Sequence, residues 1–398
     1  MIRYLFFIGF LFSFAGLAHA HEAHTEHHSS SLAVSAAFDA QGQLWRASVN
    51  GGHVVVAYSK DLGKTFSQSV VVNKAPQKIG ADSEARPKIA VAQTGQIYVT
   101  WTEALKKPFA GYIWFARSID GGKTFESPKI VHQDRDEITH RFDALNVAPD
   151  GKVTVTWVDK RDLIAAKAAK KLYDGAAIYY AISTNNGASF SVEQKLADSS
   201  CECCRIALTN KADGTVAALW RHVFAGSERD HMMAEIPAAN QQAEPKRATY
   251  GKWKVDGCPH HGAALASGGE GERWWGYHMA WFDGGNDESG KQSSLFYARM
   301  DGVAWVSSPA KKFGNMQKQA GHPALAAVGE HVWLVWREKE AGKSQIWLMK
   351  SDDEGKSWGD RTLVIEAAGN ADYPILLQHG KQVYLVWNTQ QALQVLPL

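Results

Sequence analysis

Apolar and polar residues alternate along several short segments of this chain, and each of these segments ends in a tryptophan. The segments are GQIYVTW ending at Trp101, GKVTVTW at Trp157, GTVAALW at Trp220, EHVWLVW at Trp336 and KQVYLVW at Trp387. A period of two is typical of a strand with one face against a core, so the pattern predicts half-buried β-strands.

Four octads share a second pattern. They are SKDLGKTF from Ser59, SIDGGKTF from Ser118, STNNGASF from Ser183 and SDDEGKSW from Ser351. In a tight turn the Asp or Asn side chain accepts hydrogen bonds from backbone amides, and the glycine adopts a positive φ. The final Phe or Trp packs on the sheet. We therefore interpret these aspartates as structural residues.

These octads resemble the Asp-box (BNR) repeat of the sialidase superfamily. The resemblance implies an all-β fold, a β-propeller of four-stranded antiparallel blades, and sialidase domains have six. Counting strand sets in this chain instead favours seven units, with six as the alternative. The units begin near Leu32, Arg86, Arg141, Cys204, His261, His322 and Tyr373. The last unit holds only about three strands, so we expect an N-terminal strand to complete it and close the ring.

Two features depart from the plain repeat. Residues 162–175, DLIAAKAAKKLYDG, predict a short inserted helix, which we interpret as a solvated surface helix rather than a basic docking site. Polar residues also stand two places after the strand-ending tryptophans, namely Glu103, Asp159, His222, Asp283 and Glu338. Repetition at a fixed offset indicates a structural role.

The N-terminal residues are typical of a cleaved signal peptide. Arg3 precedes an apolar stretch from Leu5 to Leu17, and Ala18 and Ala20 flank His19 at the end. The apolar run is shorter than the roughly 20 residues of a membrane-spanning helix. We expect residues 1–20 to be a signal peptide, residues 21–31 a His-rich flexible tail, and residues 32–398 a single propeller domain of a periplasmic or secreted protein.

The overall charge excludes some partners. Lys and Arg number 43 against 41 Asp and Glu, a formal net charge of +2. This balance provides no general attraction to nucleic acid or to anionic membranes. We expect a monomer with no nucleic-acid partner and no membrane span.

All four cysteines lie in two motifs at the starts of neighbouring units. The motifs are SSCECCR, with Cys201, Cys203 and Cys204, and DGCPHHG, with Cys258, His260 and His261. Inner strands of a propeller begin at one mouth of the channel, so we expect the two motifs to face each other. Thiolate and imidazole ligands select copper(I) or zinc, and for an exported protein we favour copper. The sequence thus predicts an open metal site at the axial mouth, in a protein that binds the ion or exchanges it with a metal-trafficking protein.

Disulfide bonds are the alternative for these cysteines. An even cysteine count is typical of disulfides in exported proteins, and four cysteines allow three connectivities. A bond from Cys258 to Cys201, Cys203 or Cys204 is the most plausible, and it would leave two cysteines and the adjacent histidines for a metal. Further candidate ligands are His21 and His24 of the tail, His222 and His322.

The sialidase resemblance implies a rival function, an exo-glycosidase of sialidase type. In that family three arginines hold the substrate carboxylate and a tyrosine is the nucleophile. Arg86, Arg141, Arg205 and Tyr373 stand at the starts of inner strands and are the candidates here. Glu84 stands near Arg86, but a position in a solvated loop explains it at least as well as a catalytic role. A third hypothesis is a scaffold for protein or glycan interactions, because a fold does not determine a function.

Overall fold

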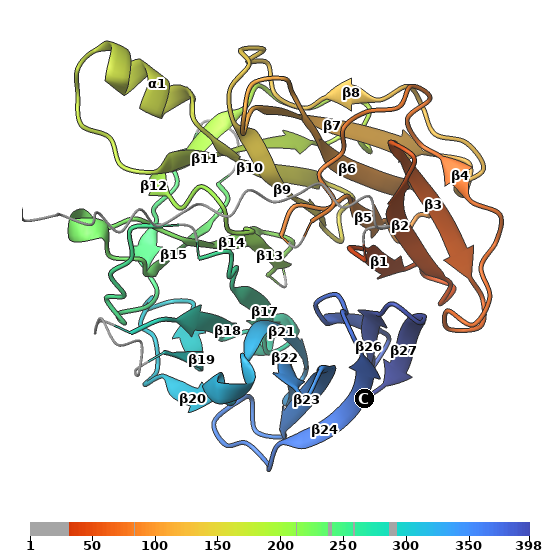
Figure 1. Ribbon diagram of the computed structural model, residues 1–398, viewed down its shortest axis with the longest axis vertical. Coiled ribbons are helices and arrows are strands. Elements are labelled where there is room, and N and C mark those ends of the chain that lie inside the picture. The colour runs from red at the N-terminus through yellow and green to blue at the C-terminus, as the bar shows by residue number, and fades with distance from the viewer. Residues whose placement is uncertain (1–31, 83, 212, 238–240, 258, 286–292) are drawn as a thin grey trace, which may run out of the picture. The chain divides into compact units, whose positions relative to one another are not determined.

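The computed structural model describes residues 32–398 except 83, 212, 238–240, 258 and 286–292. The described chain forms seven antiparallel sheets around a central channel, so the predicted seven-bladed β-propeller is confirmed (Figure 1). The expected signal peptide and His-rich tail lie outside the described residues, as do His21, His24 and Cys258.

Each blade runs in chain order from its inner strand to its outer strand. Blades one to four comprise β1 (Ser35–Phe38), β2 (Leu44–Asn50), β3 (His53–Ser59) and β4 (Val70–Val71); β5 (Lys88–Val91), β6 (Ile97–Ala104), β7 (Gly111–Ser118) and β8 (Lys129–Ile130); β9 (His140–Val147), β10 (Val153–Asp159), β11 (Ala176–Ser183) and β12 (Gln194–Ser200); and β13 (Ala207–Asn210), β14 (Val216–Arg221), β15 (His231–Glu235) and β16 (Lys246–Arg247). Blades five to seven comprise β17 (Ala264–Gly268), β18 (Gly276–Asp283), β19 (Ser294–Asp301) and β20 (Lys311–Phe313); β21 (Gly321–Val328), β22 (His331–Glu340), β23 (Lys343–Ser351) and β24 (Thr362–Ala368); and β25 (Ile375–His379), β26 (Gln382–Asn388) and β27 (Leu393–Pro397).

The helical segments are short and lie outside the blades. The α-helix α1 (Arg161–Ala168) joins β10 to β11, as predicted, although it ends earlier than the expected residue 175. Three short 3₁₀ helices are η1 (Ala225–Ser227), η2 (Gly271–Arg273) and η3 (Met316–Lys318). Within the described residues, none of the helices has the length and apolar character needed to cross a bilayer.

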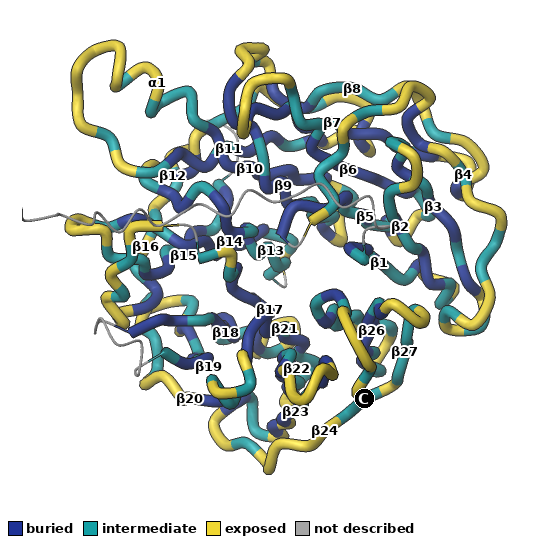
Figure 2. The backbone as a smooth tube through the Cα atoms, in the orientation of Figure 1, coloured by how far each residue is buried: buried dark blue, intermediate teal, exposed yellow. Residues whose placement is uncertain are grey.

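Strands β10 and β14 are buried on both faces, whereas the alternating pattern predicted half-buried strands. Strands β22 and β26 keep the predicted alternation, with Trp333 and Tyr384 only partly buried. All seven residues of β10 and all six of β14 are buried (Figure 2). The physical reason is that each blade packs between two neighbours, so even Thr154 and Thr156 are only 1 and 0% exposed. Two of the tryptophan indoles donate to the polar residue two places on: Trp157 Nε1 to Asp159 at 2.9 Å and Trp336 Nε1 to Glu338 at 2.9 Å.

The octad turns have the expected structural role. In the second octad Thr124 N and Oγ1 donate to the Asp120 carboxylate at 3.0 and 2.6 Å, and the Ser118 hydroxyl donates to it at 2.8 Å. These hydrogen bonds, that from the Thr124 hydroxyl above all, lower the pKa of Asp120 to about 2. Gly122 has a φ of 78°, and a Cβ there would lie 2.5 Å from Trp45 Cη2. Asn185 makes the equivalent contacts in the third octad.

The ring closes differently from our expectation. The last blade keeps three strands, and β1 pairs with β2 as the inner strand of its own blade, so no described N-terminal strand completes the last sheet. Closure comes from contacts of the last blade with the first blade and with the start of the second. Val34 N donates to Asp372 at 3.2 Å, and Arg86 donates to both Asp372 oxygens at 2.6 and 2.7 Å.

Replacing Asp372 with alanine should destabilise the closed ring. The Arg86 guanidinium and the Val34 amide would lose their buried acceptor, and removing one partner of a buried ion pair costs about 3–5 kcal/mol. Urea unfolding monitored by tryptophan fluorescence measures the change. Asp352→Ala, which removes an exposed carboxylate paired with His331, should change the free energy of unfolding by less than about 0.5 kcal/mol. Equal effects of the two substitutions would contradict this role of Asp372.

Candidate functional site

Three thiols meet at the end of β12, in the connection between the third and fourth blades. Cys201 Sγ lies 3.6 Å from Cys203 Sγ and 3.7 Å from Cys204 Sγ, and the three sulfurs all lie within 4.8 Å of one another. The residues are 2, 4 and 3% exposed and belong to a core cluster that includes Ile206 and Trp220. The three cysteines of the first motif are therefore together, but they are buried, whereas we expected an open site that also included Cys258, His260 and His261.

The distances between the sulfurs fit hydrogen bonds between thiols and not disulfide bonds. An S–S bond is about 2.05 Å long, far shorter than the separations of Cys201 from Cys203 and Cys204. Hydrogen bonds with the Cys203 and Cys204 thiols hold the pKa of Cys201 well below its ordinary value. Because the Cys204 thiol donates to Cys201, the pKa of Cys204 is raised. The arrangement favours one thiolate that accepts from its neighbours.

A buried arginine stands beside the thiols. Arg221 is 1% exposed, its carbonyl accepts from Cys201 N at 2.8 Å, and its charge further lowers the pKa of Cys201. Its guanidinium donates to the carbonyls of Arg229, His261 and Phe282 at 2.9, 3.0 and 2.8 Å. No carboxylate of the described chain lies within 4.0 Å of this guanidinium. The Cys201 thiolate is thus its nearby negative charge.

The segment with the second motif packs against the first, as predicted. A Cβ on Gly262 would lie 2.1 Å from Arg205 Cγ, and Arg221 joins the two segments through the His261 carbonyl. The histidine side chains point elsewhere. His260 is exposed, and His261 stacks on Phe282 and His322 with ring centroids 4.2 and 4.7 Å apart. No imidazole of the described residues joins the thiols in a group of three ligand atoms.

The remaining candidate histidines take part in aromatic stacks. The His222 ring packs on Phe224 with centroids 4.5 Å apart. The His322 ring lies 3.4 Å from that of Tyr373, and burial lowers the pKa of His322 to about 4. Burial likewise lowers the pKa of His261 to about 3. Both imidazoles are therefore neutral at pH 7.

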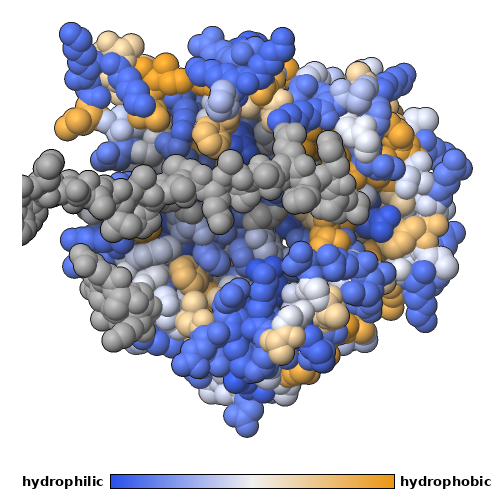
Figure 3. Space-filling model, viewed as in Figure 1, coloured by the Kyte–Doolittle hydropathy of each residue, from blue (hydrophilic) through white to orange (hydrophobic). Residues whose placement is uncertain are grey.

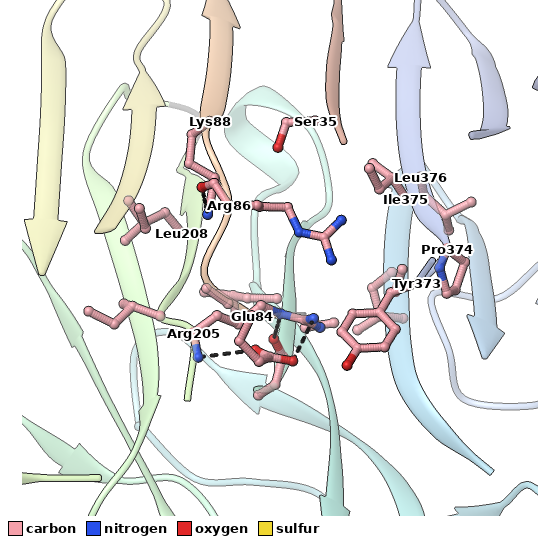
Figure 4. Close-up of a pocket in the computed structure, with 18 of the residues that line it drawn as sticks. Ser35, Glu84, Arg86, Lys88, Arg205, Leu208, Tyr373, Pro374, Ile375 and Leu376 are labelled. Atoms are coloured by element: carbon pink, nitrogen blue, oxygen red, sulfur yellow. Dashed lines mark hydrogen bonds and ion pairs between the residues drawn. The ribbon is translucent and has the colours of Figure 1, made fainter. Parts of the chain in front are cut away.

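The central channel holds a cavity of about 420 Å³, lined by the inner strands of all seven blades. Its polar groups gather where those strands begin, as the sequence predicted. They are Ser35, Glu84, Arg86, Lys88, Arg205 and Tyr373 (Figure 4). Arg141 does not line this cavity, and its guanidinium lies over the Phe142 ring. The three arginines proposed for a carboxylate clamp are thus not brought together.

The two arginines in the cavity already have partners. Arg86 makes a two-pronged pair with Asp372, and Arg205 Nη1 donates to Glu84 at 3.4 Å. Arg205 also donates to the Ala263 and Pro323 carbonyls at 3.3 and 3.1 Å. Burial alone would raise the pKa of Glu84, but the Arg205 and His322 groups lower it well below its ordinary value.

Sequence reasoning missed three groups near this mouth. Glu84, which the sequence did not distinguish from a residue of a solvated loop, is 3% exposed and joins Arg205 to His322, whose Nδ1 lies 3.4 Å from its Oε1. The Arg337 guanidinium lies 5.0 Å from the centre of the Tyr373 ring. Lys88 Nζ donates to the Arg86 carbonyl at 2.7 Å, and burial lowers the pKa of Lys88 to about 8. No repeat pattern marks these residues.

The fold and the cluster define a seven-bladed β-propeller that carries a buried three-thiol site between two blades. No protein-family model and no curated protein matches the chain. Among solved structures it is similar to a protein of unknown function from Dyadobacter fermentans, with 13% identity over 82% of this chain and 96% of that one and a TM-score of 0.53.

Two similar structures are carbohydrate-active enzymes. An ulvan lyase of polysaccharide lyase family PL25, bound to -[GlcA(1-4)Rha3S]-, shares 11% identity over 89% of each chain with a TM-score of 0.51. A Hadza microbial sialidase, Hz136, shares 14% identity over 90% of this chain and 73% of that one with a TM-score of 0.49. At these identities the likeness concerns the fold alone.

Glu84→Gln should destabilise the protein most at neutral pH. The folded-state pKa of Glu84 is depressed, so the carboxylate stabilises the fold above its ordinary pKa of 4.5 and loses this contribution as the pH falls. We expect a loss of about 2 kcal/mol at pH 7 that shrinks below about pH 4.5. Urea unfolding at a series of pH values measures it, with exposed Glu330→Gln as control. A loss independent of pH would contradict the ion pair.

Proposed function

We propose that this protein binds a soft metal ion, copper favoured, through the thiolates of Cys201, Cys203 and Cys204. The observation that carries the proposal is the spacing of the three sulfurs, at 3.6 and 3.7 Å from Cys201. Tetrahedral coordination with metal–sulfur bonds of about 2.3 Å separates neighbouring sulfurs by about 3.8 Å. The thiols therefore fit one ion with little movement.

The ligand type argues for copper(I). Thiolates without imidazole or carboxylate are a soft ligand set, and three sulfurs suffice for a copper(I) ion. Zinc takes four ligands in structural sites. In this proposal a fourth ligand for zinc would come from Cys258, because the described residues His261 and Gly262, a few positions further along the chain, contact Arg221 and Arg205.

The electrostatics support bound thiolates. Copper(I) or zinc with three thiolates carries net negative charge, which is costly to bury without a partner. The Arg221 guanidinium provides positive charge next to Cys201. Because the cluster is 2–4% exposed, it holds its ion away from solvent, as suits a protein that binds or hands on a metal rather than one that catalyses at it.

The exported location proposed from the N-terminal residues suits this role. Beyond the cytoplasm, thiols meet oxidants and scarce copper, and a buried cluster retains both its sulfur chemistry and its ion. In this proposal His21 and His24 of the tail are additional, weaker ligands that collect metal ions.

The purified protein should contain about one equivalent of copper, and Cys203→Ser with Cys204→Ser should remove it, because only one of the three clustered thiolates remains. Elemental analysis of protein prepared anaerobically measures the ratio. Glu202→Gln is the matched control, since Glu202 lies in the same loop but pairs with Lys160, and it should retain the metal.

Two results would contradict the copper site. One is full oxidation of the four cysteines in the native protein, shown by thiol counting under denaturing conditions. The other is unchanged metal content in the double serine variant. Zinc in place of copper, lost in Cys258→Ser, would instead show the four-ligand alternative.

The rival function at the channel mouth has one favourable observation. Tyr373 lies at the cavity with the guanidinium carbons of Arg86 and Arg337 at 5.5 and 5.0 Å from its ring centre, a setting that suits an acidic glycan. Against hydrolysis, Arg86 and Arg205 already hold carboxylates of the protein. The glycan would have to displace Asp372 or Glu84.

We therefore expect no turnover of a fluorogenic sialoside above that of a Tyr373→Phe control, because the arginine forks are occupied. Hydrolysis is followed by release of the fluorophore across pH 4–8. Turnover by the wild type that disappears in the Tyr373→Phe variant would establish the exo-glycosidase in place of this expectation.

A further inference from the structure

Residues 160–175 form an insertion that leaves the propeller between β10 and β11. It holds α1, none of whose residues is buried, and it extends away from the blades (Figure 1). The propeller gains no core from it. The sequence predicts a solvated surface helix here, and the contacts of the segment indicate an interaction surface.

The base of the insertion is held firmly on the third blade. Arg161 donates to both Asp159 oxygens at 3.0 and 2.8 Å and to Glu193 at 2.9 Å. The Tyr179 hydroxyl donates to Asp162 at 2.8 Å. The insertion is therefore presented in one orientation, which lowers the entropy cost of binding a partner.

Both ends of the insertion contact the segment that carries the thiols. At its start, Lys160 forms an ion pair with Glu202, the residue between Cys201 and Cys203. At its end, the Tyr173 hydroxyl donates to Asp198 at 2.7 Å, and a Cβ on Gly175 would lie 2.3 Å from the Ser200 carbonyl oxygen. The Glu202 side chain is 35% exposed, so the surface over the thiols borders the insertion.

The outer part of the insertion presents positive charge and apolar surface together. Lys167, Lys170 and Lys171 are exposed, and within the described chain no carboxylate lies within 4.0 Å of their amino groups. Leu172 is 102% exposed and Ile164 42%. Hydrophilic and hydrophobic side chains lie side by side at this corner of the surface (Figure 3). The three lysine charges and the exposed Leu172 side chain do not stabilise the fold. They are complementary to a partner surface that has carboxylates around an apolar centre.

We propose that residues 160–175 are a docking arm for an acidic protein that carries the metal to or from the three-thiol cluster. The inference rests on the metal-binding function proposed above. The partner presents carboxylates around its own metal-binding thiols, so the lysines attract it and Leu172 packs in the contact. On transfer, copper stays copper(I). Its bonds to the donor sulfurs break as bonds to Cys201, Cys203 and Cys204 form, and the protons released here pass to the donor thiolates.

Two donor peptides test the docking arm. Each carries a Cys-x-x-Cys motif loaded with copper(I), flanked by glutamates in one peptide and by serines in the other. Copper on the protein is measured after rapid anaerobic gel filtration at several times and salt concentrations. We expect transfer from the glutamate peptide to be roughly tenfold faster at low salt, and this advantage to fall as salt screens the charges.

The variants separate docking from metal binding. Lys167→Ser with Lys170→Ser and Lys171→Ser should abolish the advantage of the glutamate peptide and leave the equilibrium copper affinity unchanged. The control, with the same change in net charge, replaces exposed Lys64, Lys106 and Lys107 on the first two blades and should keep the advantage. Leu172→Ser should reduce it.

Three results would overturn the docking arm. The first is an advantage of the glutamate peptide that persists in the lysine variant. The second is sedimentation of the wild type with phosphatidylglycerol vesicles that the lysine variant loses, which would make the arm a membrane contact. The third is unchanged transfer with normal copper affinity in all variants. Absence of copper binding from either peptide would instead overturn the metal-binding function itself.

Discussion

Two guanidinium groups join the starts of the inner strands across the channel, and the arrangement of the mouth depends on them. Arg86 bonds to Asp372 and the Val34 carbonyl, which connects the second blade to the seventh and the first. Arg205 bonds to Glu84, Ala263 and Pro323 and so connects the fourth, fifth and sixth blades to the entry of the second. A blade whose second strand is buried on both faces is not stable alone, so these links complete a core that exists only in the closed ring.

This structural role explains why arginines stand at the starts of the inner strands, a pattern that from sequence alone indicated a substrate-binding site. Arg86 and Arg205 stand at the starts of inner strands because a guanidinium carries several donors and reaches carbonyls and carboxylates on neighbouring blades. Because these guanidinium groups already bind carboxylates of the protein, they are poorly available to bind a substrate. A carboxylate entering the cavity would compete with Asp372 for Arg86 and with Glu84 for Arg205, both already in place and desolvated.

The sequence predicted the blades well and their closure poorly. Alternation, the tryptophans and the octad turns are local signals, and they identified strands, turns and the count of seven. Which strand closes the ring depends on contacts between residues such as Val34 and Asp372, 338 positions apart, and no local pattern records them. The site divides in the same way. The three cysteines are close in the chain and therefore close in space. The orientation of the His261 ring instead depends on stacking with Phe282 and His322, which belong to other strands.

The negative charge of the buried thiol cluster is balanced by bound protons and by cations. Without metal, the Cys201 thiolate stands against the Arg221 guanidinium, while the raised pKa of Cys204 keeps that thiol protonated. A site of this kind remains near neutrality if an entering cation displaces one proton for each charge that it brings. Binding by all three thiolates releases two protons for either ion. Zinc then leaves the charge of the site unchanged, whereas copper(I) leaves one negative charge more than Arg221 balances. The choice between the two ions depends on the ligand number offered by the facing segment, and the burial that retains the ion also requires a partner at the surface beside Glu202 for exchange.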